Sequence, residues 1–324
     1  MKILQVLKKY SLAIVAVIIL LFIQAMCDLS LPDYTASIVN VGIQQNGIED
    51  NVPKVITEKD LNTVLLFTDK PNNILDNYKL ITKGNEKYLK EYPCLKNENI
   101  YILKDDVNIN KLEKNIQIPY LITKSLNSYD VRNEIFKGVD KNIDTVDLLK
   151  SLDNNTLNKI KEEYSKKLEK FDSSLLSQML VSSLKSDYKN IGIDVNKIQT
   201  NYIIITGIKM LSLALLAMVL AVLVTYIASY IASSFSRDLR KMVVNKVMDF
   251  SQTEFKEFGI SSLITRSTND IQQIQMFIVM LLRIVIYAPI IGLGALRKVS
   301  GNEMSWIIGL AVLVILSLVI ILFA

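Results

Sequence analysis

The chain has 324 residues, of which 50% are hydrophobic, and a formal net charge of +5 at pH 7. Its mean hydropathy of +0.30 is too apolar for a soluble domain with this many lysines, so the apolar residues must be segregated along the chain. The sequence contains no histidine, which excludes imidazole general bases, histidine metal ligands and Ser-His or Cys-His nucleophile pairs.

The two cysteines and one acidic stretch give no metal site. Cys27 and Cys94 lack the spacing of a zinc motif, and we expect two free thiols, with a bridge between them as the alternative. A stretch that begins at Asp106 imitates a calcium loop, but Lys111 stands where the loop needs glycine. We therefore expect neither a bound metal nor a catalytic group.

Four stretches are almost free of charge. Each is near the roughly 20 residues that cross a bilayer as a helix. They are Leu12–Met26, Ile203–Ile231, Phe277–Leu296 and Trp306–Ala324. The sequence thus predicts a multi-pass membrane protein.

Basic residues near the spans indicate the orientation. Lys/Arg-rich flanks resist translocation, which predicts a cytoplasmic N-terminus and residues of about 28–200 outside a bacterial plasma membrane. The residues concerned are Lys2, Lys8, Lys9, Arg237, Arg240, Lys241 and Lys246. Two residues in the expected outer turn, Arg297 and Lys298, oppose this scheme. A cleaved signal peptide is the alternative for the first span, but Met26 is a poor residue before a cleavage site.

The long segment between the first two spans has the composition of a soluble domain. Helical spacing predicts helices over Thr57–Phe67 and Asp147–Lys189, and short apolar runs predict strands over Asn99–Leu103 and Ile116–Ile122. We expect a small, helix-rich α+β domain outside the cell.

The segment after the second span has the pattern of a lever. From Ile203 to Phe250 the chain has no proline and one glycine, Gly207, so this helix can continue well beyond the bilayer. Gly259 then offers a break, and Leu263–Leu296 resumes helical periodicity. Two long helices joined by a short turn can transmit motion from a cytoplasmic partner to the spans.

Three stretches carry a resemblance to a known family. They are "DLSLPDYTASIVNVGI", "IGIDVNKIQTNYIIITGIKML" and the long "RDLRKMVVNKVMDFSQTEFKEFGISSLITRSTNDIQQIQMFIVMLLRIVIYAPIIGLGAL". The chain resembles, over residues 1–49 and 186–324, the membrane domain of bacterial ABC multidrug exporters. The resemblance is to half-transporters that pair with a second, non-identical half, and it implies transmembrane helices with long cytoplasmic extensions.

The resemblance assigns roles to the cytoplasmic turn. In that family the turn corresponding to Thr253–Ser262 is a coupling helix that rests on a nucleotide-binding domain. It implies that Glu254, Phe255, Phe258 and Ser261 make this contact. The alternative is that the two phenylalanines only hold the two long helices together.

Polar residues inside the spans are candidates to line a substrate pathway. These are Gln24, Thr225, Tyr226, Arg283 and Tyr287. Arg283 is the most costly in a bilayer, and snorkelling or pairing at the inner leaflet is its alternative role. For Gln24, Thr225 and Tyr226, an ordinary hydrogen bond between helices is the alternative.

The chain departs from the family in lacking the motor. No G-x-x-x-x-G-K-[ST] phosphate loop occurs in the sequence, so no ATPase motif lies in these residues. The resemblance implies ATP and Mg²⁺ in a nucleotide-binding domain, and a reading frame that continues past Ala324. The large outer segment is an insertion that only some relatives share.

Together these observations predict five segments. They are 1–49 with the N-terminus and first span, 50–185 as the outer domain, 186–232 with the second span, 233–275 as the cytoplasmic loop, and 276–324 with the third and fourth spans.

The leading hypothesis is an exporter half that moves amphipathic compounds, such as drugs, lipids or peptides, outward by alternating access. It implies a second half-transporter, nucleotide-binding domains and the bilayer as partners, and no nucleic acid. A force-transmitting permease with a large outer domain and a membrane receptor with an outer sensor domain are the alternatives.

Overall fold

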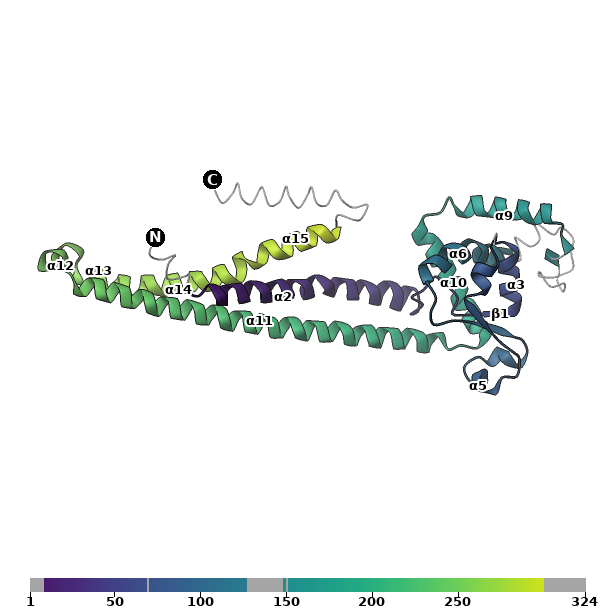
Figure 1. Ribbon diagram of the computed structural model, residues 1–324, viewed down its shortest axis with the longest axis horizontal. Helices are drawn as coiled ribbons and strands as arrows, with labels where there is room; N and C mark the ends of the chain where they lie inside the picture. Colours follow the sequence, from purple (N-terminus) through teal and green to yellow (C-terminus); the bar gives the residue numbers. More distant parts are fainter. Residues whose placement is uncertain (1–8, 69, 127–147, 150, 300–324) are drawn as a thin grey trace. The chain divides into compact units, whose positions relative to one another are not determined.

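The computed structural model describes residues 9–68, 70–126, 148–149 and 151–299 (Figure 1). The chain divides into two compact units. The first, here the helical unit, comprises residues 1–35 and 207–324, and the second, here the mixed unit, comprises residues 36–206. Each is described by itself below.

The helical unit is built from helices that are long and apolar enough to cross a membrane. Within the described residues there are three such segments, Ser11–Gln44, Val195–Met248 and Ile260–Lys298. Their most apolar windows are only 22%, 17% and 11% buried, so most of their apolar surface lacks a protein neighbour. These segments contain the first three predicted spans. The fourth, Trp306–Ala324, lies outside the described residues.

Helix α2 (Ser11–Ser37) runs antiparallel to α11 (Val195–Met248). At one end the Lys9 ammonium lies 3.0 Å from the Asp238 carboxylate, and at the other the Thr35 hydroxyl approaches the Met210 sulfur at 4.0 Å.

The core of the helical unit is apolar and takes residues from α2, α11 and α14 (Ile271–Met280), with one from the adjoining turn. Its buried members are Val17, Leu21, Val224, Ala228, Ile231, Ala232, Phe235, Leu239, Ile271, Ile278 and Leu282.

The predicted extension of the second helix is confirmed. Helix α11 has 54 residues, about 80 Å at 1.5 Å per residue, and ends only at Met248. The chain turns through α12 (Gln252–Phe258) and returns as α13 (Ile260–Thr265). Gly259 joins these two helices with a φ of +70°, a conformation that favours glycine, so the predicted break is also confirmed.

The returning helix differs from the uninterrupted helix that periodicity predicted. It contains two π-helical turns, η3 (Arg266–Asp270) and η4 (Leu281–Val285), before α15 (Tyr287–Val299) begins. Each π-turn inserts residues relative to α-helical spacing and rotates the side chains that follow. The hydropathy of the sequence does not reveal a π-turn, because α-helical and π-helical turns bury the same types of residue.

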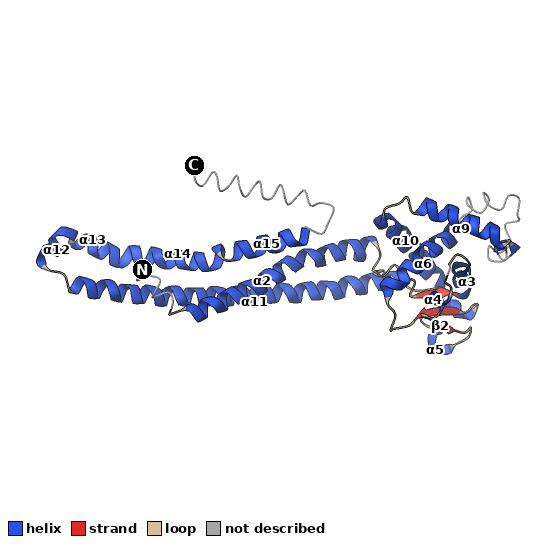
Figure 2. Cartoon of the chain, turned by 45° about the horizontal axis from the view of Figure 1, so that its top comes forward, coloured by secondary structure: helices blue, strands red, loops and turns tan. Residues whose placement is uncertain are grey.

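The mixed unit contains a three-stranded antiparallel sheet of β1 (Val55–Thr57), β2 (Tyr78–Ile81) and β3 (Ile100–Leu103), red in Figure 2. The strand order is β1-β3-β2. In the register, Val55 pairs with Ile102 and Tyr78 with Leu103. The predicted strand Asn99–Leu103 is therefore confirmed as β3.

Helices pack beside this sheet and supply most of the unit's core. They are α3 (Glu58–Leu66), α6 (Ile109–Leu126), α9 (Asn154–Leu168) and α10 (Ser173–Ile191). Side chains of Thr57, Asp153 and Asp172 cap the N-termini of α3, α9 and α10. Such caps satisfy backbone N–H groups that the first helical turn leaves without partners. The predicted helix Thr57–Phe67 is confirmed as α3.

Shorter elements complete the mixed unit. These are η1 (Ile38–Gln44), α4 (Asn72–Leu75), α5 (Glu86–Leu89) and η2 (Pro93–Lys96). Around α5 and η2 a second apolar cluster forms, with Val55, Ile81, Tyr92, Leu95, Ile100 and Ile191 buried. Gly192 ends α10 with a φ of +93° and packs against Pro93, where a side chain would collide with the proline ring.

One predicted strand is wrong. Residues 116–122 lie within helix α6, in which Leu112, Ile116, Pro119, Tyr120 and Thr123 form a buried face at helical spacing. Leu121 and Ile122 are buried as well, so the apolar run is continuous and does not distinguish a buried strand from a buried helix.

Both cysteines are free thiols. Cys27 is buried in the helical unit with Ala217 and Leu220. Cys94 is half-buried in the mixed unit, where burial raises the pKa of its thiol to about 11. Cys94 is therefore not a ready nucleophile at neutral pH.

Candidate functional site

A polar cluster joins α2 and α15 in the helical unit. The Tyr287 hydroxyl donates a hydrogen bond to the Asp28 carboxylate. The Gln24 amide donates to the same carboxylate oxygen at 3.5 Å. Two predicted pathway residues, Gln24 and Tyr287, therefore meet at a carboxylate that the sequence analysis did not select.

Local structure explains how these side chains meet. Gln24 and Asp28 are one helical turn apart on α2, so they share a face. Tyr287 is the first residue of α15. It is separated from the π-turn η4 by Ile286 alone, and the Ile286 amide donates to the Leu281 carbonyl at 3.3 Å. The sequence did contain a signal for Asp28. This residue lies four positions after Gln24 and two positions beyond the end of the first predicted span.

Further along, α2 and α15 approach closely. The Lys298 ammonium pairs with Asp33 and donates to the Leu29 carbonyl oxygen. Gly294 faces the Leu29 side chain, where a Cβ would collide with it. Lys298, one of the two charges that opposed the predicted orientation, is thus neutralised by an acid of the neighbouring helix.

The other predicted pathway residues are not part of this cluster. The Thr225 hydroxyl donates to the Ala221 carbonyl of its own helix at 2.8 Å. Tyr226 is 71% exposed, and Arg283 is exposed within η4. Neither makes a side-chain hydrogen bond or ion pair within the part of the chain that the structure describes.

Ionic contacts fix the opposite end of α2. The Asp238 carboxylate accepts hydrogen bonds from the Lys9 ammonium at 3.0 Å, the Tyr10 hydroxyl at 2.9 Å and the Arg237 guanidinium at 3.2 Å. Lys9 and Arg237, which the sequence analysis assigned to two basic clusters, therefore share one carboxylate. This contact places Lys9 and Arg237 at the same end of the helical unit.

The turn around α12 is the second functional candidate. Glu254 accepts from the Ser251 amide at 2.7 Å and from its hydroxyl at 2.9 Å, and the Ser251 hydroxyl accepts from the Glu254 amide at 3.4 Å. This reciprocal arrangement is a capping box, and the Ser251 backbone and hydroxyl hydrogen bonds hold the pKa of Glu254 below its ordinary value. Glu254 thus stabilises the turn itself.

Aromatic stacking also organises this turn. The Phe258 ring lies 5.6 Å from the Phe250 ring at an interplanar angle of 18°, and the Arg266 guanidinium lies 6.0 Å from the Phe258 ring centre. Phe258 therefore contacts the residue that follows α11 by two positions and the first residue of η3, yet it remains 42% exposed. Ser261 is exposed on α13, and the side chain of Phe255 lies outside the described residues.

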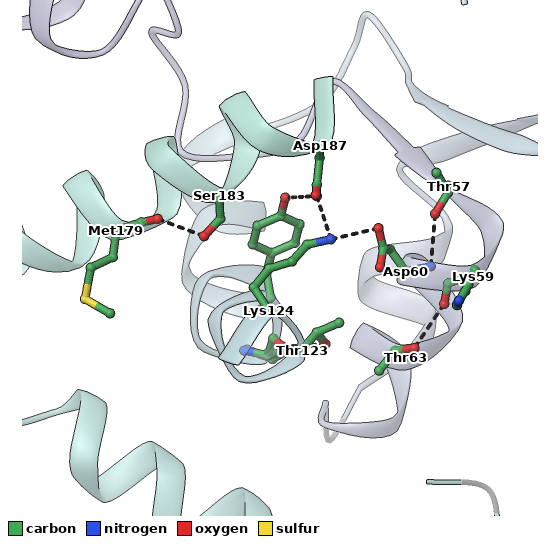
Figure 3. Close-up of polar contacts among 11 residues, drawn as sticks. Thr57, Lys59, Asp60, Thr63, Thr123, Lys124, Met179, Ser183 and Asp187 are labelled. Atoms are coloured by element: carbon green, nitrogen blue, oxygen red, sulfur yellow. Dashed lines mark hydrogen bonds and ion pairs between the residues drawn. The ribbon is translucent and has the colours of Figure 1, made fainter. Parts of the chain in front are cut away.

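A third polar group lies in the mixed unit. Figure 3 shows the Lys124 ammonium of α6 between the Asp60 and Asp187 carboxylates of α3 and α10, at 2.7 Å from each. The Tyr120 hydroxyl donates to Asp187 as well. Burial raises the pKa of Asp187, and Lys124 acts in the opposite direction. Because every member has a partner, this network serves to join three helices.

No group of three or more His, Cys, Asp or Glu side chains that could hold a metal ion occurs among the described residues. The polar groups offer hydrogen bonds and charge, and the turn around α12 exposes apolar side chains. They do not assemble a nucleophile with a general base. The fold and these sites define an integral membrane protein with an extended helical turn.

Comparison with known proteins specifies the class. Residues 157–324, more than half of the chain, match the family described as ABC transporter transmembrane region. The chain therefore belongs to this family.

Three relatives support this assignment. An uncharacterized ABC transporter ATP-binding protein of Bacillus subtilis is 30% identical over 122 residues, 38% of this chain and 20% of the relative. Uncharacterized ABC transporter ATP-binding proteins of Mycobacterium tuberculosis and Mycobacterium bovis are 30% and 31% identical over 142 residues, 41% of this chain and 24% of each relative. The chain thus spans about a quarter or less of these relatives. No solved structure matches it.

Proposed function

We propose that this chain is the membrane part of an ABC exporter half that moves amphipathic compounds out of a bacterial cell by alternating access. The exposed turn between α11 and α13 carries the proposal. Its motor would be a nucleotide-binding domain that binds ATP and Mg²⁺, and its partner a second, non-identical half-transporter. The names of the relatives, which are ATP-binding proteins, support such a motor.

The turn has the properties of a docking surface. Large apolar side chains in and beside the turn are exposed. Met248, Phe258, Ile260 and Ile264 are 81%, 42%, 68% and 58% exposed. Exposed apolar groups of this size on a polar loop are typical of a surface that a protein partner covers. Glu254, Phe255, Phe258 and Ser261 would contact the nucleotide-binding domain.

The geometry also supports transmission of motion. The stretch from Ile231 to Met248 extends α11 by about 25 Å beyond the predicted span. The capping box at Glu254 and the stacked Phe250 and Phe258 make the turn rigid, so a displacement at α12 would move both helices. In this proposal the turn lies in the cytoplasm and the mixed unit outside the cell.

The polar cluster belongs to the pathway in this proposal. Asp28, Gln24 and Tyr287 are polar groups on two membrane helices, and a carboxylate within a membrane segment is costly unless it has a function or a partner. Relative motion of α2 and α15 would break the contact between Asp28 and Tyr287. The cluster would then be exposed to substrate in one state and closed in the other.

Replacement of the two phenylalanines tests the coupling role. In the assembled transporter we expect F255A/F258A to abolish substrate-stimulated ATP hydrolysis and leave membrane insertion intact, because the apolar contact with the motor is lost. The matched control is M242A/V244A, which removes exposed apolar side chains from α11 away from the turn. Unchanged stimulation in F255A/F258A, or an equal loss in the control, would reject the proposal.

A further inference from the structure

A pocket of about 630 Å³ lies in the mixed unit where α10 ends and α11 begins. One wall is formed by the residues that follow α5, and the other by the link to α11 and the first turns of that helix. Its lining residues are Lys90, Glu91, Gly192, Ile193, Asp194, Lys197, Ile198, Thr200, Asn201 and Ile204. The volume suits a headgroup together with the first part of an alkyl chain.

In the part of the chain that the structure describes, the acidic side chains that line this pocket have hydrogen-bond partners, whereas the lysine ammonium groups do not. Asp194 accepts hydrogen bonds from the Asn196 and Lys197 amides at 3.0 and 3.2 Å, and caps the start of α11. Glu91 accepts from the Tyr92 hydroxyl at 2.9 Å. Within the described residues, the ammonium groups of Lys90 and Lys197 make no hydrogen bond or ion pair. The pocket therefore offers two free cations beside two carboxylates that already have partners.

The apolar part of the lining points to the kind of ligand. Ile193 and Ile198 are half-buried, and Ile204 is 54% exposed. An anion without an alkyl chain would leave these side chains uncovered, whereas an amphiphile would cover them and place its charge near the lysines. Lysine side chains can extend along apolar surface while the ammonium stays in a polar environment.

The position of the pocket along the chain identifies the source of such an amphiphile. Helix α11 continues without a break from the pocket into the apolar stretch Ile203–Ile231. Lys197 precedes Ile203 by about 9 Å along the helix axis, within reach of the headgroup region of a bilayer. The lipids that surround this helix therefore present their phosphates at the level of the pocket.

We propose that this pocket binds the phosphate of an anionic glycerophospholipid, held by Lys90 and Lys197, with the start of its acyl chain on Ile198 and Ile204. Bound lipid would join the segment after α5 to the first turns of α11. The proposal goes beyond the transport function and does not depend on it. It requires only that α11 spans a membrane.

Native mass spectrometry of the 324-residue chain in detergent tests this site, with phosphatidylglycerol, phosphatidylcholine and inorganic phosphate as probes. We expect K90Q/K197Q to weaken phosphatidylglycerol binding about 25-fold, from about fivefold for each lysine near a membrane surface. The charge-preserving K90R/K197R should keep the affinity. The control variant K114Q/K170Q removes two exposed lysines outside the pocket and should also keep the affinity for phosphatidylglycerol. Phosphatidylcholine should bind more weakly than phosphatidylglycerol.

Three results would overturn the proposal. The first is unchanged phosphatidylglycerol affinity in K90Q/K197Q, and the second is an equal loss in K114Q/K170Q. The third is displacement of the lipid by inorganic phosphate at matched concentration, which would identify a phosphate site without an acyl component. Because the substituted side chains are exposed and similar in length, we expect circular dichroism spectra of the variants to match the unsubstituted chain.

Discussion

The two units treat large apolar side chains in opposite ways. In the mixed unit Phe67 and Tyr120 are almost completely buried, whereas Leu211 and Val222 of the helical unit are 61% and 64% exposed. The hydrophobic effect explains both cases, because apolar side chains are more stable in any apolar environment than in water. In the mixed unit this environment is the protein's own core, and in the helical unit it is the lipid.

Charged groups show the same contrast. The mixed unit encloses Lys124 between two carboxylates, where three helices share one set of polar partners. The helical unit places its ion pairs near the ends of α2, at Lys9 with Asp238 and at Asp33 with Lys298. A charged group in the apolar middle of a bilayer has no water to solvate it, and burying it there is costly. Ion pairs therefore concentrate toward the ends of the helices.

The largest effect should come from removal of the central cation of the mixed unit. We expect K124M to destabilise this unit by about 3 kcal/mol, because two carboxylates with little access to water lose their shared partner. Hydrogen exchange of α6 and α10, followed by mass spectrometry, measures the loss. K114M, at an exposed position of the same helix, serves as the control. Equal protection in both variants would contradict the structural role of the network.

The contrast between lipid and water can be tested with one substitution at two sites. Leu216 of α11 and Leu175 of α10 are 48% and 41% exposed. We expect L216K to disfavour membrane insertion by about 3 kcal/mol, the cost of lysine near the centre of a span, and L175K to have little effect on stability. A glycosylation-based insertion assay measures the first and thermal unfolding the second. Normal insertion of L216K would show that this face of α11 does not contact lipid.

A smaller effect is expected at the polar cluster of the helical unit. Y287F removes the hydrogen bond to Asp28 and keeps the ring, so we expect a loss of about 1 kcal/mol in the stability of the helical unit in detergent. Y226F is the matched control because the Tyr226 side chain is 71% exposed. If the two variants unfold at the same temperature, the contact with Asp28 does not stabilise the unit.

The smallest effect is a pH dependence at Asp187. Burial raises the folded-state pKa of this carboxyl above its ordinary 3.8, so the folded state binds this proton more readily than the unfolded state. The ionised form therefore costs stability, which the protein regains as pH falls through the folded pKa toward 3.8. Lys124, Asp60 and Tyr120 are the groups that face it.

We expect acidification from pH 7 to pH 4 to destabilise D187N more than the unsubstituted chain. Only the unsubstituted chain gains from protonation of Asp187 within this window. Urea unfolding at the two pH values, followed by circular dichroism, provides the measurement. A larger acid-induced loss in the unsubstituted chain would mean that the pairing with Lys124 outweighs burial.

The sequence by itself determined the first three apolar helices, the extension of α11 and the break at Gly259, together with helix α3 and strand β3. These features depend on local information. A run of apolar residues, an absence of proline and a glycine at a positive φ act through neighbours along the chain. The same information wrongly predicted a strand over residues 116–122. Residues 119–122 are all buried, and a short buried run of this kind fits a strand as well as a helix.

Only the tertiary structure decided which polar residues meet. Gln24 and Tyr287 were candidates from composition, but their common partner Asp28 depends on the packing of α2 against α15 and on the π-turn that precedes Tyr287. Lys124 likewise joins two carboxylates from helices far apart in the sequence. Such contacts depend on how far one helix is shifted along its neighbour. Hydrophobic periodicity does not determine this shift, because the apolar face of each helix is nearly uniform along its length.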